Sequence, residues 1–308
     1  EKQLRNTADV VPITHKELAT VAATAGQLGI QTENIAEFTK TMATLGAISS
    51  SLGAEAAATG LAQIDNIMQT GQKSFDRYGS TAVALGDSLA TNEQRIVDFT
   101  LNIAAAGRIA RMAESQVMAI AGAYGSVGVE AQAGGTAVSK MLAGMTEAVA
   151  MGDKRLKLFA ATAGMSAAEF AAQWQEDAGE AFTRFVEGLG RSGDQAFAIL
   201  RNLGMADQRL VRGFLSVANA GDLLRRSMEI GNRAWEENIE LTRKAEERFK
   251  TRLKWLSVQR NYLTNTLQII GKAFDQTFGR IFGRLETMNK GLRRTAENFA
   301  KLPAPVRA

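Results

Sequence analysis

The chain has 308 residues, of which 45% are hydrophobic and 22% are charged, and its formal net charge is +4. These proportions are typical of a folded chain of about two domains and exclude a disordered one. The chain has no cysteine and a single histidine, His15. A disulfide framework and the usual zinc sites built from Cys and His are therefore excluded.

Proline is confined to the two ends of the chain, at Pro12, Pro303 and Pro305. Because proline breaks helix interiors, the long stretch between them can be helical almost throughout. No segment alternates apolar and polar residues over the length of a strand. We therefore predict an all-α fold, in which a multi-helix domain rich in Ala and Gly is followed by a long, coiled-coil-like helix.

In chain order, apolar residues at helical spacing predict a series of helices of ordinary length. Their ranges are 14–26, 32–45, 54–70, 73–86, 91–106, 113–125, 130–148, 153–163, 166–176, 178–190, 194–203 and 206–219. Several begin at a residue whose side chain can accept hydrogen bonds from the first N–H groups of the helix. The predicted caps are Thr32 alone and three capping boxes, which pair Thr14 with Glu17, Thr91 with Gln94, and Ser166 with Glu169.

The net charge of the chain changes from negative to positive after Gly221-Asp222. Residues 1–222 carry 18 Lys and Arg against 23 Asp and Glu, whereas residues 223–308 carry 18 against 9. We therefore predict two parts, an acidic helical domain over 1–222 and a long basic helix over 223–308, which Gly231 and later glycines could bend or interrupt. The basic side chains could attract nucleic acid or anionic lipid, or they could form the polar face of a coiled coil, which we favour.

Large apolar residues recur in the second part at steps that are mostly three or four residues. This seam consists of Phe249, Leu253, Leu256, Leu263, Leu267, Ile270, Phe274, Phe278, Ile281 and Leu285. A single helix would leave such a stripe exposed, so we expect it to associate with copies of itself. Because large residues occupy both seam positions, we favour a homo-oligomer of three chains over two.

The residues offer little for catalysis. Neither a nucleophile elbow nor an HExxH sequence is present, and Gly271-Lys272 lacks the remainder of a phosphate-binding loop. His15 lies in the first predicted capping box, where we interpret it as a surface residue of a first helical turn. We therefore expect a chain that is not an enzyme, with no cofactor, metal or small-molecule substrate.

Several phrases of the sequence resemble the core of phage tail tape-measure proteins, which are phage-related minor tail proteins of long-tailed phages. The phrases are LGIQTENIAEFTKTMATLG at 28–46, EAAATGLAQIDN at 55–66, FDRYGSTAVALGDSLATNE at 75–93 and VGVEAQAGGTAVSKML at 127–142. The last contains the family's Gly-x-Glu-x-x-x-Gly-Thr style element, here Gly128, Glu130, Gly135 and Thr136, with an additional Gly134. A weaker likeness continues through 203–224 and into the following helix.

The resemblance implies a structural protein of the virion tail that is present in the host cytoplasm during assembly. It implies a helical oligomer that sets tail length and later leaves the tube so that DNA can pass. The implied partners are the tail tube protein, the distal tail and tail-tip proteins, tail assembly chaperones and, during ejection, the host membrane. Because the chain begins with Glu1 rather than Met, we expect it to be a fragment of a longer protein.

Two other functions compete with this interpretation. The amphipathic helices of 91–163 could insert into a membrane, which would make the chain a pore or DNA-ejection factor at the tail tip. No apolar run, however, reaches the ~20 residues that a membrane-spanning helix needs. A hydrolase acting on peptidoglycan is the third alternative, which the thin catalytic inventory disfavours.

Overall fold

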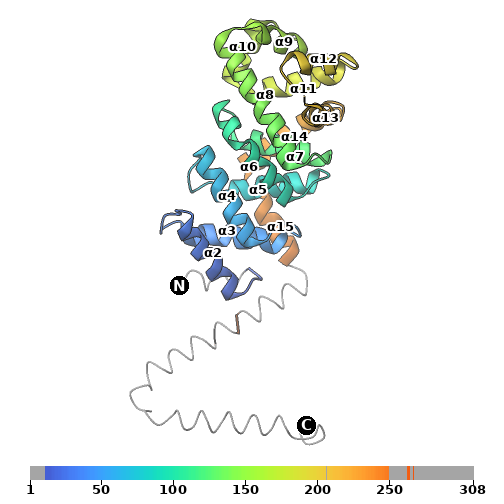
Figure 1. Ribbon diagram of the computed structural model, residues 1–308. Helices are drawn as coiled ribbons and strands as arrows, with labels where there is room; N and C mark the ends of the chain where they lie inside the picture. The colour runs from blue at the N-terminus through green and yellow to red at the C-terminus, as the bar shows by residue number, and fades with distance from the viewer. Residues whose placement is uncertain (1–10, 206, 250–261, 264–265, 267–308) are drawn as a thin grey trace, which may run out of the picture. The chain divides into compact units, whose positions relative to one another are not determined.

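A computed structural model describes residues 11–205, 207–249, 262–263 and 266 of the chain. The chain divides into two compact units, Glu1–Val258 and Gln259–Ala308. The helices described below all lie in the first unit (Figure 1). Within the described residues every regular element is a helix and none is a strand, so the predicted all-α class is confirmed.

The helices follow the predicted order, and most begin and end within three residues of the predicted bounds. They are α2 (His15–Gln27), α3 (Ile35–Ile48), α4 (Ala54–Met68), α5 (Phe75–Ser88), α6 (Glu93–Ile109), α7 (Glu114–Ser126), α8 (Ala131–Met151), α9 (Lys154–Ala163), α10 (Ala167–Glu176), α11 (Ala178–Arg191), α12 (Gln195–Asn202), α13 (Gln208–Ala218), α14 (Leu223–Glu237) and α15 (Glu240–Phe249).

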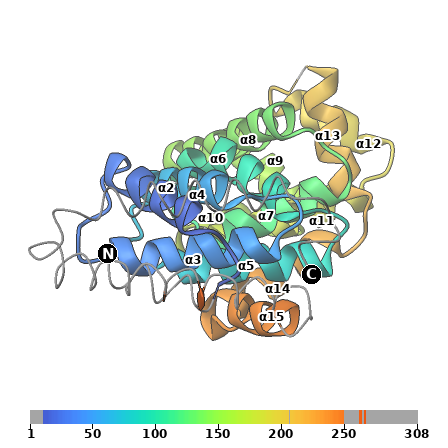
Figure 2. The same ribbon diagram turned by 90° about the horizontal axis from the view of Figure 1, so that it is seen from below.

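The helices of the first unit form two neighbouring groups that share one hydrophobic core. In the first group, α2, α3 and α4 pack together, and α4 lies against α6, which contacts α7. In the second group, α9, α10 and α11 pack together, and α11 also contacts α13. The long helix α8 connects the groups because it packs on α6 at one side and on α13 at the other (Figures 1 and 2).

Helix α7 lies at the centre of the unit, with α6, α8, α13 and α14 packed around it. Ten of its 13 residues are buried, from Ser115 to Gly125 with Gln116 excepted. A helix that is hydrophobic on all sides must be enclosed by other elements. Small residues allow the neighbours to approach closely: a Cβ on Gly107 of α6 would lie 2.6 Å from a methyl group of Val117.

Aromatic residues are scarce in the composition, but many of those described gather in the core. The ring of Phe99 on α6 lies 5.4 Å from that of Tyr124 on α7, which lies 5.9 Å from that of Phe214 on α13. The contact continues to Phe182 on α11, whose ring centre is 6.2 Å from that of Phe214. Aromatic pairs at these separations attract one another. They therefore join α6 and α7 to α11 and α13, which lie far from them in the sequence.

The long helix predicted from Leu223 is interrupted at Asn238, where the backbone adopts the left-handed conformation with φ of +52°. Asparagine tolerates this conformation better than most residues and often ends a helix. The Asn238 amide donates to the Asp76 carboxylate and accepts a hydrogen bond of 3.0 Å from Ser80 Oγ. These contacts with α5 fix the break, so the chain turns and continues as α15.

Helices α14 and α15 pack on the helices that precede them. α14 lies across α7 and α5, and α15 lies on α5 and α3. Gly231 does not bend α14 but lies against α7, where a Cβ would be 2.9 Å from the carbonyl oxygen of Ser115. The segment predicted to form a separate basic part therefore begins with two helices that complete the first compact unit.

Candidate functional site

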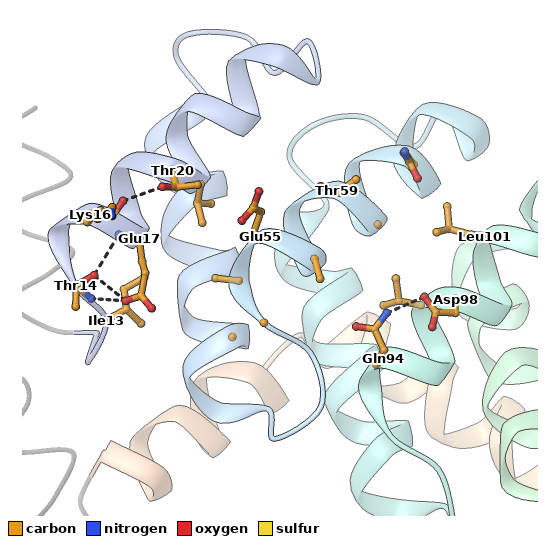
Figure 3. Close-up of a pocket in the computed structure, with 18 residues that line it drawn as sticks. Ile13, Thr14, Lys16, Glu17, Thr20, Glu55, Thr59, Gln94, Asp98 and Leu101 are labelled. Carbon is orange, nitrogen blue, oxygen red and sulfur yellow. Dashed lines mark hydrogen bonds between the residues drawn. The ribbon is translucent and has the colours of Figure 1, made fainter.

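An open groove with a volume of about 1060 Å³ lies between α2, α4 and α6 (Figure 3). Its apolar lining includes Val21 of α2, Ala54 and Gly60 of α4, and Val97 and Leu101 of α6. Several lining residues on α4 are small, and the helices approach one another closely here: a Cβ on Gly60 would lie 2.5 Å from a Val97 methyl group. The groove is therefore a shallow apolar surface rather than an enclosed cavity.

Charged side chains at the rim of this groove are mostly acidic. Figure 3 shows Lys16 and Glu17 on α2, Glu55 on α4 and Asp98 on α6. The Glu17 carboxylate accepts hydrogen bonds of 2.8 Å from the Thr14 N–H and hydroxyl groups. The carboxylate of Asp98 accepts one of 2.7 Å from Gln94. Within the described residues Glu55 has no such partner, so its exposed carboxylate is available for a cation.

Two of the predicted helix caps are confirmed. At α2, Thr14 Oγ1 accepts from Glu17 N at 3.2 Å, and the Glu17 carboxylate accepts from Thr14 N at 2.8 Å. At α10, the same reciprocal pair joins Ser166 and Glu169. Each box satisfies two N–H groups that would otherwise lack partners within the helix. Here their role is to set the start of each helix.

The other two predicted caps are wrong. Asn92, not Thr91, caps α6, because its side chain accepts from Arg95 N at 2.9 Å. The Thr91 hydroxyl is buried without a hydrogen-bond partner and lies where a Cβ on Gly125 of α7 would be 2.6 Å away. The side chain of Gln94 donates to Asp98 instead of returning to the cap.

Thr32 does not cap α3, which begins later, with Asn34 at the N-cap position. Residues 31–34 form a turn that the loop between α4 and α5 holds in place. The side-chain oxygen of Gln72 accepts 2.8 Å and 3.2 Å hydrogen bonds from Gln31 N and from the Asn34 amide. A partner about 40 residues away in sequence thus decides this boundary, and local spacing could not predict it.

The element at 128–136 has a local structural explanation. Gly128 ends the turn after α7 with φ of +75°, which favours glycine. The carboxylate of Glu130 caps α8 by accepting from the N–H groups of Gln132 and Ala133 at 3.1 and 3.0 Å. These hydrogen bonds lower the pKa of Glu130 below its ordinary value.

Within the same element, Gly134 and Gly135 bring α8 against α6. A Cβ on Gly134 would lie 2.8 Å from the Phe99 ring, and one on Gly135 would lie 2.4 Å from Asn102 Cβ. Thr136 is exposed, and its hydroxyl group donates to the carbonyl oxygen of Gln132 at 2.8 Å. The element therefore serves as a turn, a cap and a close helix crossing.

Sequence reasoning missed a partly buried polar cluster beneath the turn that joins α4 and α5. Thr70 Oγ1 lies 2.7 Å from both the Tyr78 hydroxyl and the Glu114 carboxylate, and Asp65 accepts from Gly71 N at 3.1 Å. Burial raises the pKa of Asp65 and that of Tyr78 above their ordinary values. The sequence signal that could have indicated the cluster was Asp65, an acidic residue on the apolar side of α4. The cluster ties α4, α5 and α7 together.

A second polar cluster attaches α15 to the rest of the unit. Lys244 is buried, forms an ion pair with Asp87 of α5, and lies 3.9 Å from the carboxylate of Glu93 at the start of α6. Glu93 also accepts hydrogen bonds from Ser49 and Ser51 in the turn before α4. The ion pairs of Lys244 join residues that are about 150 positions apart in the sequence. Helical spacing alone could therefore not identify them.

Most residues of the predicted seam lie outside the described residues. Phe249, at the end of α15, is half-buried against the core, and the side chain of Leu263 is exposed. Nothing in the structure tests the remaining positions. These are Leu253, Leu256, Leu267, Ile270, Phe274, Phe278, Ile281 and Leu285.

Clusters with metal-binding character are absent from the described residues, where no group of three His, Asp or Glu side chains could hold an ion. His15 begins α2, and its Nε2 atom is buried without a hydrogen-bond partner. Among the helices that the structure describes, none is both long and apolar enough to cross a membrane.

Comparison with known proteins matches residues 1–225 to the family model described as phage-related minor tail protein. This match covers well over half of the 308 residues. The chain belongs to the phage-related minor tail protein family. It is therefore a structural component of a phage tail. Neither the curated proteins nor the solved structures contain a match.

The residues that match the minor tail protein model include α2 to α13 and the start of α14. Both the groove between α2, α4 and α6 and the element at 128–136 lie within them. The features that shape these two regions are small residues and caps, which determine how closely helices pack.

Proposed function

We propose that this minor tail protein is a tape-measure protein, a helical ruler without enzymatic activity that templates assembly of the tail tube. The observation that carries the proposal is the four phrases that occur in order between 28 and 142 and resemble that class. Membership in the minor tail protein family supports it. In this proposal the chain sets tail length during assembly and leaves the tube before DNA ejection.

A helical chain is a suitable ruler because its length grows by 1.5 Å with each residue. The apolar seam would be buried between copies of the chain, and we propose a homo-oligomer of three chains. The proposed partners are the tail tube protein, the distal tail and tail-tip proteins, and assembly chaperones. Native mass measurement of the full chain tests the self-association, and a monomer at all concentrations would contradict it.

The decisive experiment changes the length of the chain in the complete phage gene. Deleting residues 267–294 removes four heptads and keeps the seam in phase. If the ruler is helical, tails should be shorter by about 40 Å, measured by electron microscopy of many particles. Duplicating the same residues is the matched variant and should lengthen tails by the same amount. Tails of unchanged length in both variants would contradict the ruler.

The alternative function, a membrane-active ejection factor, has less support from the described residues. Its candidate helices, α6 to α9, bury their apolar sides against one another and against α13 and α14. Inserting them into a bilayer would require this core to open. We therefore favour the ruler. A turbidity assay on isolated cell walls tests the proposal that the chain is not a hydrolase, and we expect no clearing.

A further inference from the structure

We propose that the groove between α2, α4 and α6 binds α12 of a second copy of this chain, head to tail. The groove lies at one end of the first unit, whereas α12 lies at the other end, beyond α11 and α13 (Figures 1 and 2). The two surfaces cannot meet within one copy of the folded unit. A contact between them must therefore join two copies. The proposed contact does not depend on whether the chain sets tail length.

Helix α12 presents an apolar side chain beside an unpaired cation. Phe197 is 41% exposed, and among the described residues of the first unit it is the largest of the exposed hydrophobic side chains. Arg201 follows four residues later, so both lie on the same side of the helix. Within the described residues neither Arg201 nor the exposed Arg191 at the end of α11 has an ion-pair partner. Between Arg191 and the end of α12, Asp194 is the one acidic residue, so this surface carries more positive than negative charge.

The groove offers the complementary surface. Its apolar lining of small and β-branched residues can accept an aromatic ring, and three carboxylates surround it against one lysine. Glu55 is the acidic residue without a described partner, so we pair it with Arg201 of the second copy. A buried aromatic side chain next to an Arg–carboxylate pair is a frequent arrangement at protein interfaces.

Other exposed apolar residues fit the groove less well. Ile239 is 51% exposed, but Glu236, Glu237 and Glu240 surround it in sequence, and they would be repelled by the acidic rim. Met151 is 73% exposed at the end of α8 and has no arginine one turn away on the same helix. Ile109 is 66% exposed beside Arg108, but its side chain is smaller than that of Phe197, and Arg108 already donates to the Ile67 carbonyl and to Gln69. Charge and side-chain size together therefore favour α12.

A contact that joins different surfaces of identical chains repeats from copy to copy. Such head-to-tail contacts close into a ring when the rotation permits and otherwise extend into a filament. The predicted seam, in contrast, would associate chains side by side. The two contacts use different residues, so variants can separate them.

Cross-linking of the full chain tests the contact directly, because the natural sequence has no cysteine. One preparation carries Ala56→Cys at the groove, and a second carries Ala198→Cys beside Phe197; both alanines are exposed. Mixed under mild oxidation, they should form a disulfide-linked dimer within minutes. The matched control replaces the first variant with Ala143→Cys, an exposed alanine on α8 away from the groove, and should form at most a tenth as much dimer.

Association measurements provide an independent test. Sedimentation of the full chain at several concentrations should show that Phe197→Ser raises the dissociation constant by about tenfold or more. Met151→Ser removes another exposed apolar side chain and should leave it unchanged. Glu55→Lys should also weaken association, and adding Arg201→Glu in the same chain should restore it. Equal dimer yields in the control mixture, or no effect of Phe197→Ser and Glu55→Lys, would overturn the proposal.

Discussion

At the scale of single residues, the element at 128–136 shows how small residues determine helix packing. Gly134 faces the Phe99 ring and Gly135 faces Asn102, so α8 crosses α6 without intervening side chains. Gly144 lies on the same helix, where an added Cβ would meet no neighbouring atom within 4 Å. Gly134 and Gly144 therefore differ in their surroundings and not in their secondary structure.

Replacing each of them with alanine should change stability in opposite directions. Gly134→Ala forces a methyl group against Phe99 and should lower the free energy of unfolding by about 1–3 kcal/mol. Gly144→Ala should raise it by about 0.5–1 kcal/mol, because alanine loses less backbone entropy in a helix. Urea denaturation followed by circular dichroism measures both. A destabilisation of similar size at Gly144 would contradict the packing explanation.

The capping carboxylate of Glu130 predicts a dependence of stability on pH. Its pKa in the folded chain is lowered below 4.5 because two backbone N–H groups bind the charged form. The stabilisation is therefore complete above pH 4.5 and is lost as the pH falls through the folded pKa. Glu130→Ala should destabilise the chain at pH 7, and the difference from the natural chain should shrink toward pH 3. Thermal unfolding at a series of pH values measures it.

Residue-level prediction from sequence succeeded where a cap depends on residues three positions apart. The boxes of Thr14 and Ser166 are of this kind. It failed at Thr32 and Thr91, where Gln72 and Gly125 from other elements determine the local structure. The groove itself could not be predicted, because its lining comes from three helices whose packing distance depends on Gly60 and Val97.

At the scale of elements, α15 is attached mainly through one side. Its buried residues are Leu241, Lys244 and Ala245, and Leu241 lies against Gly79 of α5. Apolar spacing predicted helix through this region but not the break at Asn238, which Asp76 and Ser80 stabilise from α5. Helical periodicity reports only which residues share one face of a helix. It contains no information about a side chain from another helix that ends the first one.

Removing the ammonium group of Lys244 should loosen α15. Lys244→Ala leaves the buried Glu93 and the half-exposed Asp87 without their cation, which should cost about 2 kcal/mol or more. Hydrogen exchange should then become faster in residues 240–249 while α7 stays protected. Arg243→Ala is the control on the same helix, since its ion pairs with Glu240 and Glu247 are exposed and contribute little. Equal effects would argue against the attachment.

At the scale of the whole molecule, the order and approximate bounds of the helices were predictable from glycine punctuation and apolar spacing. Their assembly was not, because α8, α13 and α14 reach their partners through long-range packing around α7. The same core bears on the alternative membrane function. Apolar sides that would contact lipid are occupied by neighbouring helices.

We therefore expect the folded chain to leave lipid vesicles intact. Dye release from vesicles containing anionic lipid should stay at background while the near-ultraviolet circular dichroism of the buried aromatic residues is native. Release should begin only under conditions, such as acid or mild denaturant, that abolish this signal. Leakage at low protein concentration with a native spectrum would instead support the ejection factor.

The position of α14 over α7 has a consequence for synthesis of the protein on the ribosome. Ser115 of α7 bonds to Asn232 of α14 at 2.7 Å, across 117 residues of chain. Translation runs from the N-terminus, so α7 emerges long before the helix that covers it. Until residue 237 has left the exit tunnel, the nascent polypeptide displays the apolar surface of α7. We therefore expect this surface of α7 to be accessible to other proteins during that interval and to be covered once α14 folds over it.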